Sequence, residues 1–303
     1  MRKENNITKK QHYIPQVYLR GFSPEYLESE KKEIPTARYT IYCYDLKTEN
    51  QINKAVPIKS VCFCENLYEV IGDNRKIVIP NYLEKIFFKI ETNYGKYRHN
   101  LEIKAFNKEN NKTKCFLTGE EKIFWATYIL IQILRIPQIL ELAAQTALET
   151  WGDEINEQQA KNIAKIFCLP FFRKMKEENK EVEIFNTLFK PMEEMSFGVG
   201  VDRKGKIITS DKPIYMYTKE FSCKEYEKVI FPISSQICLF LFGGEEKEKS
   251  RKNFLFEIND DVREEIVKSM TVTSFQKLYS NHVLDKTELK CVKEVLEHKG
   301  SYS

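Results

Sequence analysis

The order of strand-like and helix-like segments predicts an α+β fold with a mixed or mainly antiparallel sheet, a central helical section and C-terminal helices. β-Branched and aromatic residues fill residues 38–45 and return in short runs between residues 196 and 242. Between these two regions, apolar residues recur at helical spacing over residues 83–97 and 125–133. We expect one α+β domain over residues 1–303, with a weak internal boundary near 174–195.

The first β region begins with a strand at residues 38–45. Lys47-Thr48-Glu49-Asn50 has the composition of a turn, and residues 51–58 form the returning strand. A second hairpin is expected around Gly72-Asp73-Asn74, between residues 68–71 and 76–79.

The helical section begins with the amphipathic pattern at residues 83–97. Thr118-Gly119-Glu120-Glu121 has the spacing of a capping box and predicts the start of a long apolar helix. Pro137 lacks a backbone donor, so this helix should kink or end near it. A further helix is expected over residues 156–167, before the charged residues 174–183.

The last third of the chain returns to strands and then to helices. Helices are expected at 260–279 and 285–296, the second opening with capping-box spacing at Asp285 and Glu288. The expected strands are 196–201, 206–209, 214–217, 228–233 and 237–242.

Composition limits the function classes. The 48 basic and 44 acidic residues give a net charge of only +4, too balanced to indicate nucleic-acid binding by bulk charge. A local basic face around Lys3, Lys9, Lys10 and Arg20 stays open. The N-terminus lacks an apolar signal segment, and the apolar run at 123–133 is shorter than the ~20 residues that span a bilayer. We expect a cytoplasmic protein without a membrane partner.

Cysteine spacing argues against a metal site. The closest pair among the eight cysteines, Cys62 and Cys64, is separated by one residue and lacks C-x-x-C spacing. We expect buried free thiols and no metal ligands among the site residues.

The chain also lacks the phosphate-loop, dinucleotide, nucleophile-elbow and H-E-x-x-H motifs. Cofactors remain unknown, and magnesium held by a few carboxylates stays open.

The segment from Gln11 to Phe22 is the strongest candidate for a site. It combines a histidine, two glutamines, two tyrosines and an arginine within twelve residues, more hydrogen-bonding groups than packing alone needs. His12 is the one histidine of four in such a polar and aromatic setting. It can act as a general acid or base near neutral pH. Gln16 and Arg20 are candidate substrate contacts.

Later polar residues need partners as well. Gln132 and Arg135 share one face of an apolar helix, where they form either a structural network or an anion contact. Glu84 and Glu91 are seven residues apart on one helix face, as an ion-paired flank or the edge of a site. The run from Thr209 to Pro213 fits a turn, or a loop that projects Ser210 and Asp211 into a pocket.

Taken in order, several of these motifs resemble the bacterial domain-of-unknown-function family 4238. The resemblance covers roughly residues 11–282 and rests on His12 to Phe22, Phe63 to Tyr68, Glu84, Glu91, Gln132 to Pro137, Thr209 to Ile214, Phe231 to Ser234 and Asn281. The resemblance implies a bacterial or phage-linked protein whose motif residues converge. It also favours the pocket over the turn as the role of Ser210 and Asp211. The family often has a small polar residue where Lys212 stands, so the charge beside Asp211 differs here.

Two function classes remain. The first is a nuclease-like hydrolase of bacterial defence or toxin systems that acts on nucleic acid or a nucleotide. His12 would be its acid or base, Arg20 and Arg135 would neutralise phosphate, and Asp211 would orient His12 or hold a metal. Gln16, Gln132 and Ser210 would contact the substrate. The second is a binding or structural protein whose motif residues form a buried polar network.

A transferase with a nucleotide cofactor is compatible with the same residue types, and the oligomeric state stays open. The two main classes share one geometric expectation. His12 or Arg20 should lie close to at least one of Arg135, Ser210 and Asp211, because separated polar motifs in an apolar chain must find partners.

Overall fold

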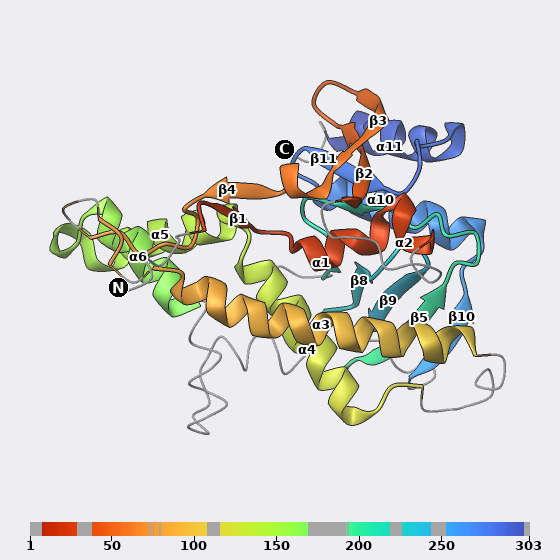
Figure 1. The fold of residues 1–303 in the computed structure, drawn as a ribbon, viewed down its shortest axis with the longest axis horizontal. Helices are drawn as coiled ribbons and strands as arrows, with labels where there is room; N and C mark the ends of the chain where they lie inside the picture. The colour runs from red at the N-terminus through yellow and green to blue at the C-terminus, as the bar shows by residue number, and fades with distance from the viewer. Residues whose placement is uncertain are drawn as a thin grey trace.

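A computed structural model describes residues 8–28, 38–72, 74, 76–78, 80–107, 116–168, 192, 194–218, 226–243 and 253–299. Within these residues, three mostly antiparallel sheets are combined with helices, which confirms the predicted α+β class (Figure 1). The charged residues 174–183 and most of the expected boundary at 174–195 lie outside the described residues.

A five-stranded sheet has the strand order β10-β5-β9-β8-β7, and only the β10–β5 pair is parallel. Its central strand β9 is almost entirely buried, as expected for a continuous apolar run. Gly198 and Gly200 of β5 leave room for rings and side chains of β10 and the residues after it. The strands are β5 (Ser196–Val201), β7 (Tyr215–Tyr217), β8 (Lys228–Pro232), β9 (Ile237–Phe242) and β10 (Phe254–Glu257).

A four-stranded antiparallel sheet joins distant parts of the chain in the order β3-β2-β11-β6. The predicted helix at 260–279 is wrong in its last third, because α10 (Asp260–Thr273) ends before a strand at residues 277–280. That strand finds two partners, β2 on one side and β6 on the other. The strands are β2 (Thr40–Asp45), β3 (Asn50–Pro57), β6 (Thr209–Ser210) and β11 (Lys277–Ser280).

A two-stranded antiparallel sheet, not expected from the sequence, pairs β1 (Lys10–His12) with β4 (Phe63–Glu65). The hairpin expected around Gly72 forms a short antiparallel pairing. Ile71 and Ile77 are bridge partners, the N–H of Val78 donates to the carbonyl of Val70, and the N–H of Gly72 donates to that of Lys76, both at 2.9 Å. Positions 73, 75 and 79 of that hairpin lie outside the described residues.

The helices follow their local signals. Thr118 accepts a bond from the N–H of Glu121, whose carboxylate accepts from the N–H of Thr118, so the capping box is confirmed. Pro137 does end the long apolar helix, but it also occupies the first turn of the next one. The helices are α3 (Tyr82–Phe106), α4 (Gly119–Leu134), α5 (Pro137–Trp151), α6 (Glu157–Cys168), α10 and α11 (Lys286–Lys299), with short 3-10 turns at Ile58–Ser60 and Gly152–Glu154.

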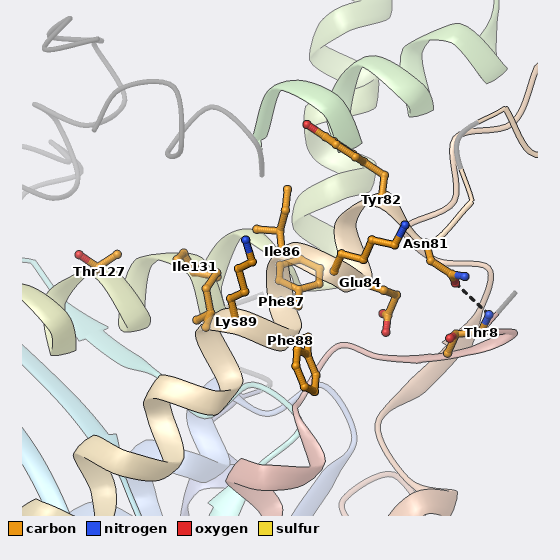
Figure 2. Close-up of a pocket in the computed structure, with 12 residues that line it drawn as sticks. Thr8, Asn81, Tyr82, Glu84, Ile86, Phe87, Phe88, Lys89, Thr127 and Ile131 are labelled. Carbon is orange, nitrogen blue, oxygen red and sulfur yellow. Dashed lines mark hydrogen bonds between the residues drawn. The ribbon is translucent and has the colours of Figure 1, made fainter. Parts of the chain in front are cut away.

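Taken singly, none of the described helices has both the length and the apolar character needed to cross a bilayer. The segments Gly119–Leu134 and Pro137–Glu154 meet that test only as a pair bent by 69°. Side chains of α3 and α4 line a shared hollow near the start of α3, shown in Figure 2.

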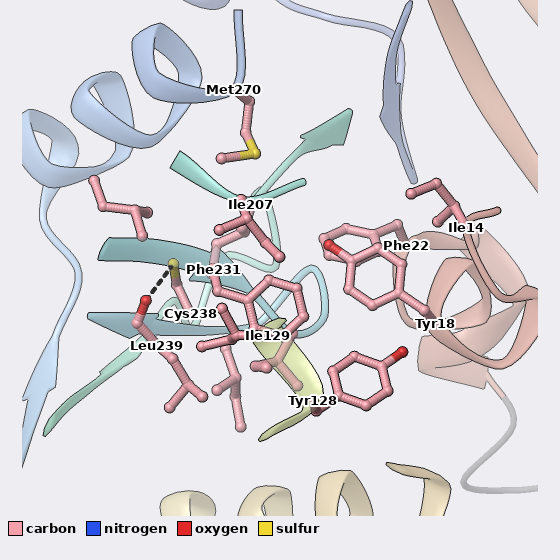
Figure 3. Packing of buried hydrophobic residues seen from close by; sticks show 14 of the residues in the cluster. Ile14, Tyr18, Phe22, Tyr128, Ile129, Ile207, Phe231, Cys238, Leu239 and Met270 are labelled. Carbon is pink, nitrogen blue, oxygen red and sulfur yellow. Dashed lines mark hydrogen bonds between the residues drawn. The ribbon is translucent and has the colours of Figure 1, made fainter. Parts of the chain in front are cut away.

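The N-terminal segment lies between the four-stranded sheet and the long helix α3 (Figure 1). It consists of α1 (Gln16–Leu19), a 3-10 turn at Arg20–Phe22 and α2 (Pro24–Glu28). The ring of Tyr18 stacks on Phe231 of β8, with centroids 5.6 Å apart, and both lie in one large buried cluster (Figure 3). The candidate motif is therefore part of the core that unites the sheets with the helices.

Gly200→Ala tests how tightly β5 and its neighbours pack. A Cβ at this position would lie 2.9 Å from Ile258, so we expect a loss of about 1–3 kcal/mol in unfolding free energy. Gly119→Ala is the matched control, because a Cβ there meets nothing within 4 Å. Chemical denaturation measures both. Equal stability of the two variants would contradict the packing argument.

Candidate functional site

The guanidinium of Arg135 links the N-terminal motif to the helices. Its Nη2 donates to the carbonyl of His12 at 2.5 Å, and its Nη1 donates to Oε1 of Glu91 at 3.1 Å. Nε lies 3.4 Å from the hydroxyl of Tyr68, which donates to the carbonyl of Arg135 at 2.9 Å. The Arg135 side chain is buried, with its charge 4.1 Å from the ring centre of Phe87. The expectation that the N-terminal motif reaches Arg135 is confirmed.

Other groups hold the backbone carbonyls of the same segment. Nε2 of Gln132 donates to the carbonyl of Tyr13 at 2.7 Å, and Nη1 of Arg98 donates to that of Val17 at 2.7 Å. The N–H of Ser235 donates to the carbonyl of Gly21 at 2.8 Å. Gln132 and Arg135 therefore support the motif backbone.

The hydroxyl of Tyr18 fixes the segment to the sheets. It donates to the carbonyl of Pro232 at 2.9 Å and lies 2.7 Å from Oγ1 of Thr209. Because the Tyr18 proton is used on Pro232, the Thr209 hydroxyl is the donor in the second bond. A Cβ at Gly21 would approach the carbonyl oxygen of Ile233 to 3.0 Å, which explains glycine at that position.

Asp211 shapes the turn between α10 and β11. Its carboxylate accepts from the Ser274 hydroxyl at 2.8 Å and from the N–H groups of Phe275, Gln276 and Lys277 at 2.9, 2.9 and 3.0 Å. These four bonds occupy the carboxylate, so Asp211 orients this turn rather than His12.

Ser210 lies next to Asp211 in β6. Its Oγ accepts from the N–H of Lys212 at 3.2 Å and lies 4.0 Å from the sulfur of Met270. Of the two alternatives for the run from Thr209 to Pro213, these hydrogen bonds support the turn, because they tie Ser210 and Asp211 to the β6–β11 region. The expected contact of His12 with a later motif is the hydrogen bond from Arg135, and Tyr18 adds contacts to Thr209 and Pro232.

His12 is only partly used by the fold. Its ring lies 5.8 Å from that of Phe63, and Nε2 of Gln16 lies 3.4 Å from its Nδ1. Burial lowers the pKa of His12 below its ordinary value; the carbonyl of Lys59 opposes this, and the charges of Arg135 and Lys10 add to it. The imidazole is therefore neutral near pH 7 and able to accept a proton.

Arg20 also keeps free bonding capacity. Its guanidinium lies 5.6 Å from the ring centre of Tyr39, and its side chain is partly exposed. Within the described part of the chain, Nε of Arg20, Nε2 of His12 and Oε1 of Gln132 are buried without a hydrogen-bond partner. Such atoms cost stability, because they lose their hydration without gaining a partner.

Helix α3 contributes two carboxylates on one face, as the seven-residue spacing predicted. Glu91 pairs with Arg135 and keeps 28% of its side chain exposed. Burial raises the pKa of Glu84 to about 7; the charge of Arg135 opposes this, while Glu91 and Glu69 add to it. The spacing of Glu84 and Glu91 left open a helix flank or the edge of a site, because the burial of Glu84 depends on groups from other segments.

His12, Gln16 and Arg20 recur every four residues along the N-terminal segment, which packs on α3. A Cβ at Gly95 of α3 would lie only 3.7 Å from Val17. Burial disfavours the charged form of both groups, so it lowers the pKa of His12 and raises that of Glu84. We define the candidate site as these three residues together with Glu84 and Glu91.

The hollow beside this site has a volume of about 1020 Å³. Glu84 and Phe88 point to the same side of α3, and Thr8 also lines the hollow (Figure 2). Among the residues that the structure describes, no three His, Cys, Asp or Glu side chains are arranged to hold a metal ion.

Asp211→Asn separates a structural role from a catalytic one. Loss of the charge weakens three bonds to backbone N–H groups, so we expect the unfolding free energy to fall by about 1.5–3 kcal/mol. Any activity per folded molecule should persist. Asp153→Asn, at an exposed position, is the control. If the Asp211→Asn variant lost activity while its stability was unchanged, Asp211 would have a role in catalysis.

Glu84→Gln tests the burial of the acid. An unfolded glutamate ionises at its ordinary, lower pKa, so the folded protein takes up a proton between that value and about 7. Wild-type stability should therefore fall as the pH rises through this window. We expect the variant to melt higher than the wild type at pH 8 and to lose this advantage at pH 4.

Thermal melts across pH measure this difference, with Glu154→Gln at an exposed position as the control. An advantage of the Glu84→Gln variant that is the same at every pH would contradict the raised pKa.

Comparison with known proteins gives one match. The sequence model of the family described as "Protein of unknown function (DUF4238)" matches residues 10–282. No curated protein and no solved structure matches. The matched range contains the N-terminal motif, α3 with both glutamates, and Arg135. The chain therefore belongs to the DUF4238 family of proteins of unknown function.

Proposed function

We propose that this chain hydrolyses phosphodiesters, with His12 as the base, Glu84 as the acid and Arg20 as the phosphate contact. The observation that carries the proposal is that some of the polar site residues are used in hydrogen bonds of the fold, while the others are partly exposed. Gln132, Arg135, Ser210 and Asp211 are engaged in hydrogen bonds of the fold. The other polar residues, His12, Gln16, Arg20 and Glu84, are partly exposed.

The base is Nδ1 of His12. The amide nitrogen of Gln16 lies beside Nδ1 and favours the ring form in which this atom accepts and Nε2 carries the proton. At 3.4 Å this contact is long, so a water molecule can replace the amide at Nδ1. Gln16 is then a positioning residue that selects the reactive form of the ring.

Hydrolysis requires two proton transfers. Nδ1 of His12 takes a proton from water as the water oxygen attacks phosphorus. The protonated carboxyl of Glu84 gives its proton to the leaving oxygen as the P–O bond breaks. A carboxyl group with a pKa of about 7 is half protonated at neutral pH, which suits this role. Arg20 neutralises charge on the non-bridging oxygens.

The proposed partner is nucleic acid or a nucleotide. The proposed setting is the bacterial cytoplasm, within a defence or toxin system.

A non-catalytic function is the second candidate, and one observation favours it. Side chains of Arg135, Gln132 and Arg98 hold three backbone carbonyls of the motif. A motif that serves only to lock the core would need such bonds and no reactive side chain. In that case the motif residues form a buried polar network.

His12→Ala distinguishes the two candidates. We expect hydrolysis of a labelled single-stranded oligonucleotide to fall about 10²–10⁴-fold, with little change in melting temperature. His99→Ala, on the exposed side of α3, is the control and should change neither. A His12→Ala protein that melts many degrees lower, and loses activity only in proportion to unfolding, would favour the structural candidate.

A further inference from the structure

Phe88 is an exposed aromatic ring beside the candidate site. Its side chain is 72% exposed, and it lies one helical turn from both Glu84 and Glu91 on the same face of α3. Burial of such a ring is worth about 1.5–3 kcal/mol, and the fold leaves it in water. Single exposed apolar residues are common, so the surroundings of Phe88 decide its meaning.

These surroundings form a hollow with apolar walls. Phe88 lines this hollow of about 1020 Å³ together with Tyr82, Ile86 and Ile131. In Figure 2 the side chains of Tyr82 and Ile86 extend from the side of α3 opposite to Phe88. Tyr82 is itself 37% exposed. Ligand pockets usually have volumes of about 300–1,000 Å³, so this space accepts a planar ring and the groups attached to it.

Two cations border the same hollow. Lys85 and Lys89 line it, and both are exposed. In the described part of the chain, neither lysine forms an ion pair. Lys9 and Lys10 follow Thr8, another lining residue, and are exposed as well. The region therefore offers aromatic faces together with unpaired positive charge, although the whole chain is nearly balanced.

We propose that this hollow binds single-stranded nucleic acid, with one base stacked on Phe88 and the backbone phosphates on Lys85 and Lys89. Aromatic faces interleaved with cations are typical of such surfaces. In a duplex the base faces are stacked on each other, so Phe88 favours a single strand. Glu84 lies one turn from Phe88, so the bound strand presents a phosphodiester to the acid of the proposed reaction. Only this last step rests on the proposed function.

The experiment measures binding without turnover. Fluorescence anisotropy of a labelled single-stranded oligonucleotide is recorded with the full-length His12→Ala protein. Phe88→Ala in this background should weaken binding about 5- to 150-fold, the loss expected for one stacked base. Phe88→Tyr should retain the affinity, and Tyr217→Ala, which removes an exposed ring on β7, should not change it.

Salt dependence tests the cations separately. Lys85→Gln and Lys89→Gln should each reduce the slope of log affinity against log salt by about 0.7. Lys293→Gln on α11 is exposed and should leave the slope unchanged. Both positions on α3 are exposed, so these variants should fold normally, as thermal melts would verify.

Three results would overturn the inference. One is equal binding of duplex and single strand, and another is an affinity that Phe88→Ala leaves intact. The third is self-association of the protein that Phe88→Ala abolishes, because a second copy would then occupy the hollow. Binding that depends on Phe88 without any hydrolysis by the wild type supports this inference and contradicts the proposed reaction. Hydrolysis by the wild type without Phe88-dependent binding supports the proposed reaction and contradicts this inference.

Discussion

The buried guanidinium of Arg135 is the group on which the rest of the arrangement depends. A charge removed from water is stable only when it is paired and hydrogen-bonded, and removal of one partner typically costs about 3–5 kcal/mol. Arg135 meets this demand with Glu91 of α3, the hydroxyl of Tyr68 and the carbonyl of His12. Because these partners come from three segments of the chain, one cation fixes the N-terminal motif against the helices.

The way in which the motif is held explains how it can also carry a site. Its backbone carbonyls, and the hydroxyl of Tyr18, provide the contacts to the helices and the sheet. Because the backbone is fixed, the side chains of His12, Gln16 and Arg20 need no structural partner. Preorganisation of this kind is what proton transfer and anion binding require. A structural network and a reactive site are compatible in one segment.

The site has a cost in stability. Glu84 and His12 lose hydration on burial, and the fold replaces it only in part. This loss raises the pKa of Glu84 and lowers that of His12. Phe88 stays in water, and Nε of Arg20 lacks a partner among the described residues. Local features that weaken a fold are concentrated where proteins bind and react. Here they gather along one face of α3 and the segment opposite it.

Local patterns were enough to predict the α+β class, the capping box at Thr118 and the polar character of the N-terminal motif, because periodicity and caps depend on neighbours within one or two turns. The end of the helix expected at 260–279 could not be predicted in this way, since Asp211 holds the N–H groups of residues 275–277 from a distant part of the chain. Long-range contacts also separate the candidate reactive residues, such as His12 and Arg20, from residues that support the fold, such as Asp211. Whether a buried polar group is already satisfied depends on long-range partners, such as Glu91 for Arg135, and spacing in the sequence carries no record of them.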